Sequence, residues 1–218
     1  MAHALIIFDC DGVLVDSEPI VNRLLVAALA QEGLHLSFDE VDREFLGLSW
    51  PATLDIIEAR LGRPVAGDFL DRLQRASFEG LRRELRPVPG IEAALERIEQ
   101  PVCVASSGEQ AKIRNSLELT GLLSRFEGRL FSAEQVAQGK PHPDLFLFAA
   151  ESLGVLPAEC AVIEDSLNGV HGAAAAGMRV FAYEPPVALA RGWHGAFRDA
   201  GATVFQDMNE LPALLEDA

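Results

Sequence analysis

The segment LIIFDCDGVLVD, residues 5–16, decides the fold of this chain. Its first four residues are apolar and lead into two carboxylates, Asp9 and Asp11, with Gly12 next. In an extended segment residues i and i+2 face the same side, so both carboxylates leave a strand end together, where like charges repel. Such a pair is costly unless positive charge lies beside it or the two acids have different tasks. The pair therefore indicates a functional site at the end of a buried strand.

Five later segments have the pattern of short buried strands, and helical patterns lie between them. The predicted strands are 102–105, 128–131, 160–163, 179–182 and 203–205, and the predicted helices are 111–120, 143–153 and 169–176. Strands that alternate with helices at this spacing predict an α/β fold with a Rossmann-like parallel sheet covered on both faces. Ligands bind such sheets at the carboxyl ends of the strands, where Asp9, Ser106 and Asp165 fall.

Residues 17–86 have a different pattern, without a convincing strand. Apolar residues at three-four spacing predict amphipathic helices over 19–33, 38–46, 52–61 and 68–85. The segment PVPG, residues 87–90, then marks the return to the sheet. We therefore expect a core domain of residues 1–16 and 87–218 with an inserted α-helical cap domain of residues 17–86. The two connections between the cap domain and the core domain would lie near the predicted site. We therefore expect that the cap domain can act as a lid over the site.

Composition narrows the possible partners. The net charge of −15, from 33 acidic and 18 basic residues, disfavours non-specific binding to nucleic acid or anionic lipid. No apolar run approaches the roughly 20 residues of a membrane span, and no signal peptide is evident. Cys10, Cys103 and Cys160 lie in or beside apolar runs without metal-site spacing, as is typical of buried reduced thiols. We expect a cytoplasmic protein, monomer or weak dimer, with neither nucleic acid nor membrane as partner.

Four groups of polar residues fall at or beyond predicted strand ends. They are Asp9 with Asp11, Ser106-Ser107-Gly108, Lys140 within GKPHP, and Glu164-Asp165-Ser166. Clustered carboxylates suit Mg²⁺, which also uses substrate phosphate oxygens as ligands. The lysine and the hydroxyl groups before a helix suit a dianionic phosphate. One carboxylate can then attack phosphorus while another transfers protons.

Each group also has a purely structural interpretation. The acid pair can shape a turn, Ser106-Ser107 can cap a helix, Lys140 can be a surface residue, and Glu164-Asp165 can cap the next helix. We favour the functional interpretation because four such groups in this order, each beside a predicted strand end, are improbable by accident.

These residues resemble the motifs of the haloacid dehalogenase-like (HAD) hydrolase superfamily. Residues 9–17 resemble its first motif, Ser106 its second, Lys140 its third and Glu164-Asp165 its fourth. The helical insert resembles the cap of the branch that contains β-phosphoglucomutase and phosphoglycolate phosphatase. The resemblance covers nearly the whole chain and implies the HAD fold.

The resemblance also implies catalytic and phosphate-binding roles. By resemblance Asp9 is the nucleophile that becomes aspartyl-phosphate, and Asp11 is the general acid and base. Ser106, Ser107 and Lys140 would bind the phosphoryl group, and Lys140 would also keep Asp9 ionised.

A Mg²⁺ site is implied in the same way. Its ligands would be Asp9, the backbone carbonyl of Asp11 and Asp165, with Glu164 as a ligand or as support for the ligands. The cation and Lys140 would offset the repulsion between the two opening carboxylates.

Two features exclude neighbouring chemistries of the superfamily. Haloacid dehalogenases as a family lack an acid at the position of Asp11, because their leaving group is halide; a carboxylate there fits the oxygen leaving group of a phosphate ester. The phosphonate-cleaving branch uses a Schiff-base lysine from the cap, and residues 18–86 contain no lysine.

A β-phosphoglucomutase-like hexose-phosphate mutase is the alternative enzyme. In such mutases the cap carries a His shortly after the first motif and an Arg after a Gly-x-Ser turn, and here Val21 and Trp50 take these positions. Gly108 and Glu109 replace the groups that meet a second phosphate. We therefore favour a phosphatase, with Trp50 as the candidate cap residue that lines the substrate pocket.

The expected function is thus Mg²⁺-dependent hydrolysis of small phosphorylated metabolites, in particular sugar or sugar-acid phosphates. Residues 45–53 and the GKPHPD segment resemble bacterial sugar-phosphate phosphatases, including 6-phosphogluconate phosphatases. The expected partner is a small-molecule phosphate ester. A non-catalytic binding protein on the same fold is a third interpretation, against which the intact set of motif residues argues.

Overall fold

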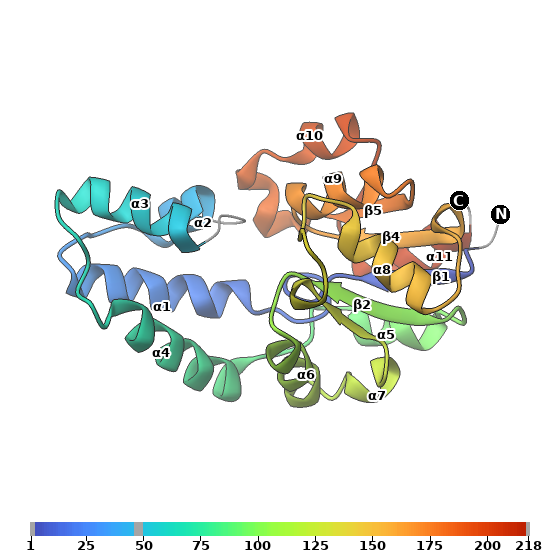
Figure 1. Ribbon diagram of the computed structural model, residues 1–218, viewed down its shortest axis with the longest axis horizontal. Coiled ribbons are helices and arrows are strands. Elements are labelled where there is room, and N and C mark those ends of the chain that lie inside the picture. The colour runs from blue at the N-terminus through green and yellow to red at the C-terminus, as the bar shows by residue number, and fades with distance from the viewer. Residues whose placement is uncertain (1–2, 46–49, 217–218) are drawn as a thin grey trace. The chain divides into compact units, whose positions relative to one another are not determined.

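The computed structural model of the protein describes residues 3–45 and 50–216 (Figure 1). The chain divides into two compact units. One contains the residues up to Asp16 and those from Arg86 onward, and the other is Ser17–Leu85. The expected boundary lay one residue later, after Arg86.

The first unit is built on a six-stranded sheet in the order β3-β2-β1-β4-β5-β6. Its strands are β1 (Leu5–Phe8), β2 (Val102–Ser106), β3 (Leu130–Ser132), β4 (Cys160–Glu164), β5 (Arg179–Tyr183) and β6 (Thr203–Phe205). All neighbouring strands are parallel, which confirms the predicted fold class. The chain proceeds from β1 to one side through β2 and β3 and then returns to the other side with β4. The switch point, where such sheets bind ligands, therefore lies at the end of β1.

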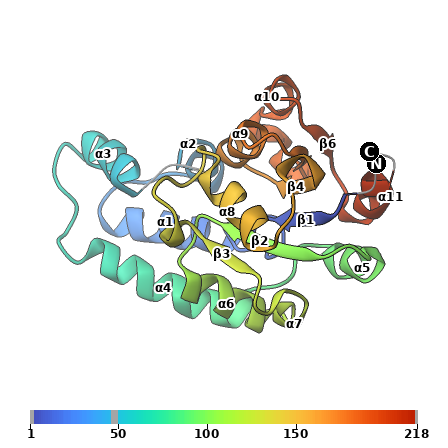
Figure 2. The ribbon, with the colours of Figure 1, turned by 45° about the vertical axis from the view of Figure 1, so that its right-hand side comes forward.

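Helices cover both faces of this sheet (Figures 1 and 2). They are α5 (Ile91–Arg97), α6 (Gln110–Leu119), α7 (Leu123–Phe126), α8 (Asp144–Ser152), α9 (Leu167–Ala175), α10 (His194–Asp199) and α11 (Leu211–Glu216). Side chains alternate along β1, so Ile7 packs in one buried cluster with Phe146 of α8 and Val170 of α9. On the other face the Phe8 ring meets the Phe126 ring of α7 edge to face, with centroids 5.9 Å apart.

The second unit contains four helices: α1 (Glu18–Gln31), α2 (Phe38–Phe45), α3 (Trp50–Leu61) and α4 (Phe69–Glu84). Leu25 and Leu29 of α1, and Phe69 and Leu73 of α4, lie four positions apart on one face of their helices and form a core with Ile57 of α3. The predicted helix over 38–46 has its last residue, Leu46, outside the described residues. No helix in the described part of the chain is long and apolar enough to cross a membrane.

Candidate active site

The acidic loop after β1 is fixed by the neighbouring strand. The Asp9 amide donates to the Ile163 carbonyl of β4 at 2.9 Å, so Asp9 continues the β1–β4 ladder for one residue. Gly12 then turns the chain with φ of +80°, a conformation that glycine adopts without strain. A Cβ atom at Gly12 would lie 2.1 Å from Oδ2 of Asp165. The fold thus brings the Asp165 carboxylate against the loop that carries Asp9 and Asp11.

Lys140 joins two of the acids. Its Nζ lies 2.5 Å from Oδ1 of Asp9 and 2.5 Å from Oε1 of Glu164, and its side chain is only 4% exposed. Burial alone lowers the pKa of Lys140, but the two carboxylates outweigh burial and raise it. Lys140 is therefore a buried ammonium group that connects the ends of β1 and β4.

Glu164 has donors on both carboxylate oxygens. Oε1 accepts from Lys140, and Oε2 accepts from the amides of Asp165 and Ser166 and from the Ser166 hydroxyl at 2.9–3.1 Å. Ser166 also accepts from the Gly169 amide at 3.0 Å and so caps the start of α9. The carboxylate of Glu164 is thus turned toward Lys140 and the helix start. This geometry favours support of the site over direct binding of a cation.

The charge balance of the site fits a divalent cation. Four carboxylates, Asp9, Asp11, Glu164 and Asp165, face two lysines, so the site carries a charge of about −2 when all groups are ionised. Burial raises the pKa of Asp9, Lys140 opposes this effect, and Glu164 and Asp11 add to it. The protein alone therefore supplies too little positive charge to stabilise these carboxylates.

The donor set suits Mg²⁺ in particular. Within the described residues no three His, Cys, Asp or Glu side chains are grouped to hold a metal by themselves. Mg²⁺ instead binds through one or two carboxylates and completes its shell with water and substrate oxygens. Asp9, Asp165 and the backbone carbonyl of Asp11 are the groups here that fit this pattern.

The two serines at the end of β2, Ser106 and Ser107, occupy different environments. Phe8 pairs with Val104, so Ser106 lies two residues further along β2, level with the acidic loop. Ser106 is buried, and its Oγ accepts from the Gly108 amide at 3.2 Å. Ser107 is exposed. The structure therefore places buried Ser106 level with the acidic loop and leaves the next residue, Ser107, exposed to solvent.

Two residues that lie at the site, Lys112 and Ser132, were not predicted from the sequence. Lys112, in the first turn of α6, has its Nζ 2.8 Å from Oδ2 of Asp11. Ser132, the last residue of β3, donates from Oγ to the Gly108 carbonyl at 2.6 Å and so holds the loop after β2. One signal for Lys112 was available, because Lys112 and Lys140 are the only lysines among the 18 basic residues of the sequence. A serine at a strand end gives no comparable signal.

Trp50, the remaining predicted site residue, belongs to the helical unit. It is the first residue of α3, and 44% of it is exposed. The preceding Gly-x-Ser segment, residues 47–49, lies outside the described residues.

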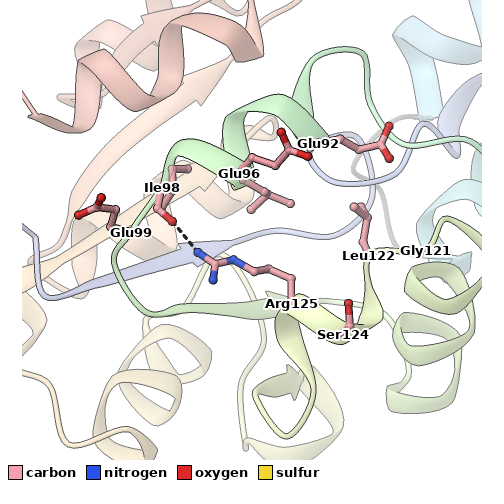
Figure 3. Close-up of a pocket in the computed structure, with 9 residues that line it drawn as sticks. Glu92, Glu96, Ile98, Glu99, Gly121, Leu122, Ser124 and Arg125 are labelled. Atoms are coloured by element: carbon pink, nitrogen blue, oxygen red, sulfur yellow. Dashed lines mark hydrogen bonds between the residues drawn. The ribbon is translucent and has the colours of Figure 1, made fainter.

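A separate hollow of about 470 Å³ contains none of the predicted site residues (Figure 3). It is lined by acidic residues of α5 and the loop that follows it, with Arg125 of α7 donating to the Ile98 carbonyl at 2.5 Å. Its loops precede β2 and β3 along the chain, so it lies at the amino edge of the sheet. The site described above is at the carboxyl edge.

Comparison with known proteins agrees with this geometry. The family model of haloacid dehalogenase-like hydrolases matches residues 3–177. The chain is 34% identical to 6-phosphogluconate phosphatase of Escherichia coli K12 over 81% of this chain and 80% of that protein. It is 32% identical to hexitol phosphatase B of the same organism over 84% of each chain.

A solved structure extends the agreement to the fold. A HAD family hydrolase of Deinococcus radiodurans R1, solved with bound phosphate and sodium, matches with a TM-score of 0.87 and 30% identity, over 99% of this chain and 96% of that one. The resemblance found in the motifs is thereby confirmed. The chain belongs to the haloacid dehalogenase-like hydrolase family.

Proposed function

We propose that this protein is a Mg²⁺-dependent phosphatase of small phosphorylated metabolites, in particular sugar or sugar-acid phosphates, and that it acts through an aspartyl-phosphate on Asp9. The observation that carries the proposal is the buried Lys140 ammonium between Asp9 and Glu164, with Asp165 against the same loop. A nucleophilic carboxylate, a fixed positive charge and a place for a cation are what transfer of a phosphoryl group needs.

In the proposed reaction Asp9 attacks phosphorus, and the bond between phosphorus and the ester oxygen breaks as Asp11 gives that oxygen a proton. Asp11 then takes a proton from water, whose oxygen attacks phosphorus and releases phosphate from Asp9. Ser106 and Lys140 bind the phosphoryl oxygens, and Ser107 borders the same anion site. The atoms and protons balance over the two steps, and the enzyme returns to its starting state.

Mg²⁺ would be held by Asp9, Asp165 and the backbone carbonyl of Asp11, and when bound it supplies positive charge against the phosphoryl oxygens. We leave Glu164 out of this ligand set, because Lys140, Ser166 and the Asp165 amide already donate to its oxygens. In this proposal Glu164 holds Lys140 in position.

The substrate class is supported by the named relatives. The E. coli proteins at 34% and 32% identity are a 6-phosphogluconate phosphatase and a hexitol phosphatase. The Deinococcus hydrolase was solved with phosphate bound. A phosphorylated polyol or sugar acid is therefore the first substrate to test. Trp50 stays the proposed cap residue for substrate selection.

Phosphate release from a panel of esters tests the proposal. The panel contains p-nitrophenyl phosphate, 6-phosphogluconate, hexitol phosphates and β-glucose 1-phosphate with a bisphosphate primer, each with Mg²⁺ and with EDTA. We expect Mg²⁺-dependent phosphate release, and Asp9→Asn should lower it by about 10³-fold or more. Asp199→Asn, at an exposed position at the end of α10, is the control and should be unchanged.

The other outcomes separate the alternatives. Conversion of β-glucose 1-phosphate to glucose 6-phosphate without net phosphate release would identify a mutase. No turnover of any ester would support a non-catalytic binding protein. Full activity of a pure Asp9→Asn variant would remove Asp9 as the nucleophile.

A further inference from the structure

Lys112 is a cation at a position of its helix where a positive charge is electrostatically unfavourable. It lies in the first turn of α6, near the positive end of the helix dipole, and the last turn of the helix carries no basic residue. Of the 18 basic residues in the chain, 16 are arginines; the two lysines are Lys112 and Lys140. Both lysines contact acids at the site, so the placement of Lys112 is explained by Asp11 and not by the helix.

The contact between Lys112 and Asp11 has a defined geometry. Nζ of Lys112 is 2.8 Å from Oδ2 of Asp11, and the two side chains are 43% and 28% exposed. Lys112 is thus a charged donor aimed at one oxygen of the proposed acid and base, at the partly open side of the site.

We propose that Lys112 is a positioning residue for Asp11. Its ammonium holds Oδ2, so that Oδ1 is the oxygen that exchanges a proton with the reacting groups. This inference rests on the proposed function, because the transfer of a proton by Asp11 is a step of the proposed phosphatase reaction. Oδ1 gives its proton to the ester oxygen as the bond to phosphorus breaks, Lys112 pairs with the carboxylate that forms, and Oδ1 then takes the proton of the attacking water.

The proposal predicts a dependence on the leaving group. A sugar alkoxide needs a proton to leave, whereas the dinitrophenolate of 2,4-dinitrophenyl phosphate does not. The sugar phosphate for this test is the one that the wild-type protein hydrolyses fastest. Lys112→Met should lower kcat/KM for this substrate by about tenfold or more. For the dinitrophenyl ester the loss should be less than about threefold. Asp11→Asn should show the same selective loss, and Lys112→Met added to Asp11→Asn should cost nothing further.

Arg114→Met provides a matched control. Arg114 lies on the same helix and forms an exposed ion pair with Glu127, so its loss should leave both esters unaffected. Thermal unfolding of each variant checks that the fold is intact.

A second variant keeps the test independent of any folding defect. Lys112→Cys can be alkylated with 2-bromoethylamine, which restores an ammonium group at nearly the same distance. Cys10, Cys103 and Cys160 are buried, so reagent should reach only the new thiol in the folded protein. Alkylation should recover most of the activity toward the sugar phosphate.

The possible results distinguish a failure of the proposed Lys112 role from a failure of the proposed phosphatase function. Equal losses on both esters, no loss on either, or no recovery after alkylation of a folded protein would overturn the role of Lys112 and leave the phosphatase intact. If the wild-type protein hydrolyses neither ester, the phosphatase itself is refuted, and the role of Lys112 with it.

Discussion

At the scale of single residues, the sequence was informative where a side chain follows a buried strand. Asp9, Ser106 and Asp165 were predicted at strand ends, and the structure has them at or directly after the ends of β1, β2 and β4. Lys112 was not predicted. The rarity of lysine in the chain distinguishes it, but its contact with Asp11 joins residues 101 positions apart, and no local pattern encodes that contact. Contacts of this kind depend on the order of strands in the sheet.

Gly169 provides a test at the same scale. A Cβ atom there would lie 1.8 Å from Cδ of Glu164, which has no space to move because both its oxygens are bound. Gly169→Ala should therefore displace Glu164 from Lys140, lower the free energy of unfolding by about 1–3 kcal/mol and reduce phosphate release. Urea unfolding and the ester panel measure both effects.

Gly195→Ala is the control, because a Cβ atom at this position of α10 meets nothing within 4 Å. It should leave stability unchanged or slightly increased. A Gly169→Ala protein as stable and active as wild type would contradict the packing described around Glu164.

At the scale of elements, periodicity predicted the longer helices and missed the short ones. The helices expected over 111–120, 143–153 and 169–176 appear as α6, α8 and α9 within two residues at each end. The helices α5, α7, α10 and α11 have four to seven residues, too few to repeat an apolar pattern. The strand expected over 128–131 begins only at Leu130, because Gly128 has φ of +76° and turns the chain.

A substitution of Glu32 tests the packing of the helical unit, Ser17–Leu85. The carboxylate of Glu32, 6% exposed, accepts from Arg63, Arg72 and the Ala66 amide at 2.9–3.3 Å. These contacts connect the end of α1 to α4 and to the segment before it. Glu32→Gln should lower the free energy of unfolding by about 1.5–3 kcal/mol at neutral pH. Glu79→Gln, which loses only an exposed pair with Arg83, should cost less than about 1 kcal/mol.

The effect of Glu32 should depend on pH. Burial raises the pKa of Glu32, but the Ala66 amide and the two arginines outweigh burial, so the pKa lies below its usual value of 4.5. A group with a lowered pKa stabilises the fold above its unfolded value and loses that contribution as pH falls through the folded value. Denaturation curves of wild type and Glu32→Gln should therefore converge as pH falls below 4.5. A constant difference down to acid pH would exclude this ionic role.

At the scale of the whole molecule, the sheet order is what assembles the site. The sequence predicted a parallel sheet with a helical insert, since alternation of strands and helices is a local pattern. The order β3-β2-β1-β4-β5-β6 was not predicted, because strand pairing depends on how each crossover packs. That order puts β1 between β2 and β4, so Asp9 emerges beside Ser106 on one side and Asp165 on the other.

Identification of the phosphorylated residue tests the central claim most directly. The protein is mixed with Mg²⁺ and its fastest substrate, quenched during turnover and reduced with borohydride, which converts an aspartyl-phosphate to homoserine. Peptide mass analysis should find homoserine at position 9 in the wild-type protein and none in Asp9→Asn. Turnover with no modified residue, or with homoserine at any position other than 9, would contradict the account.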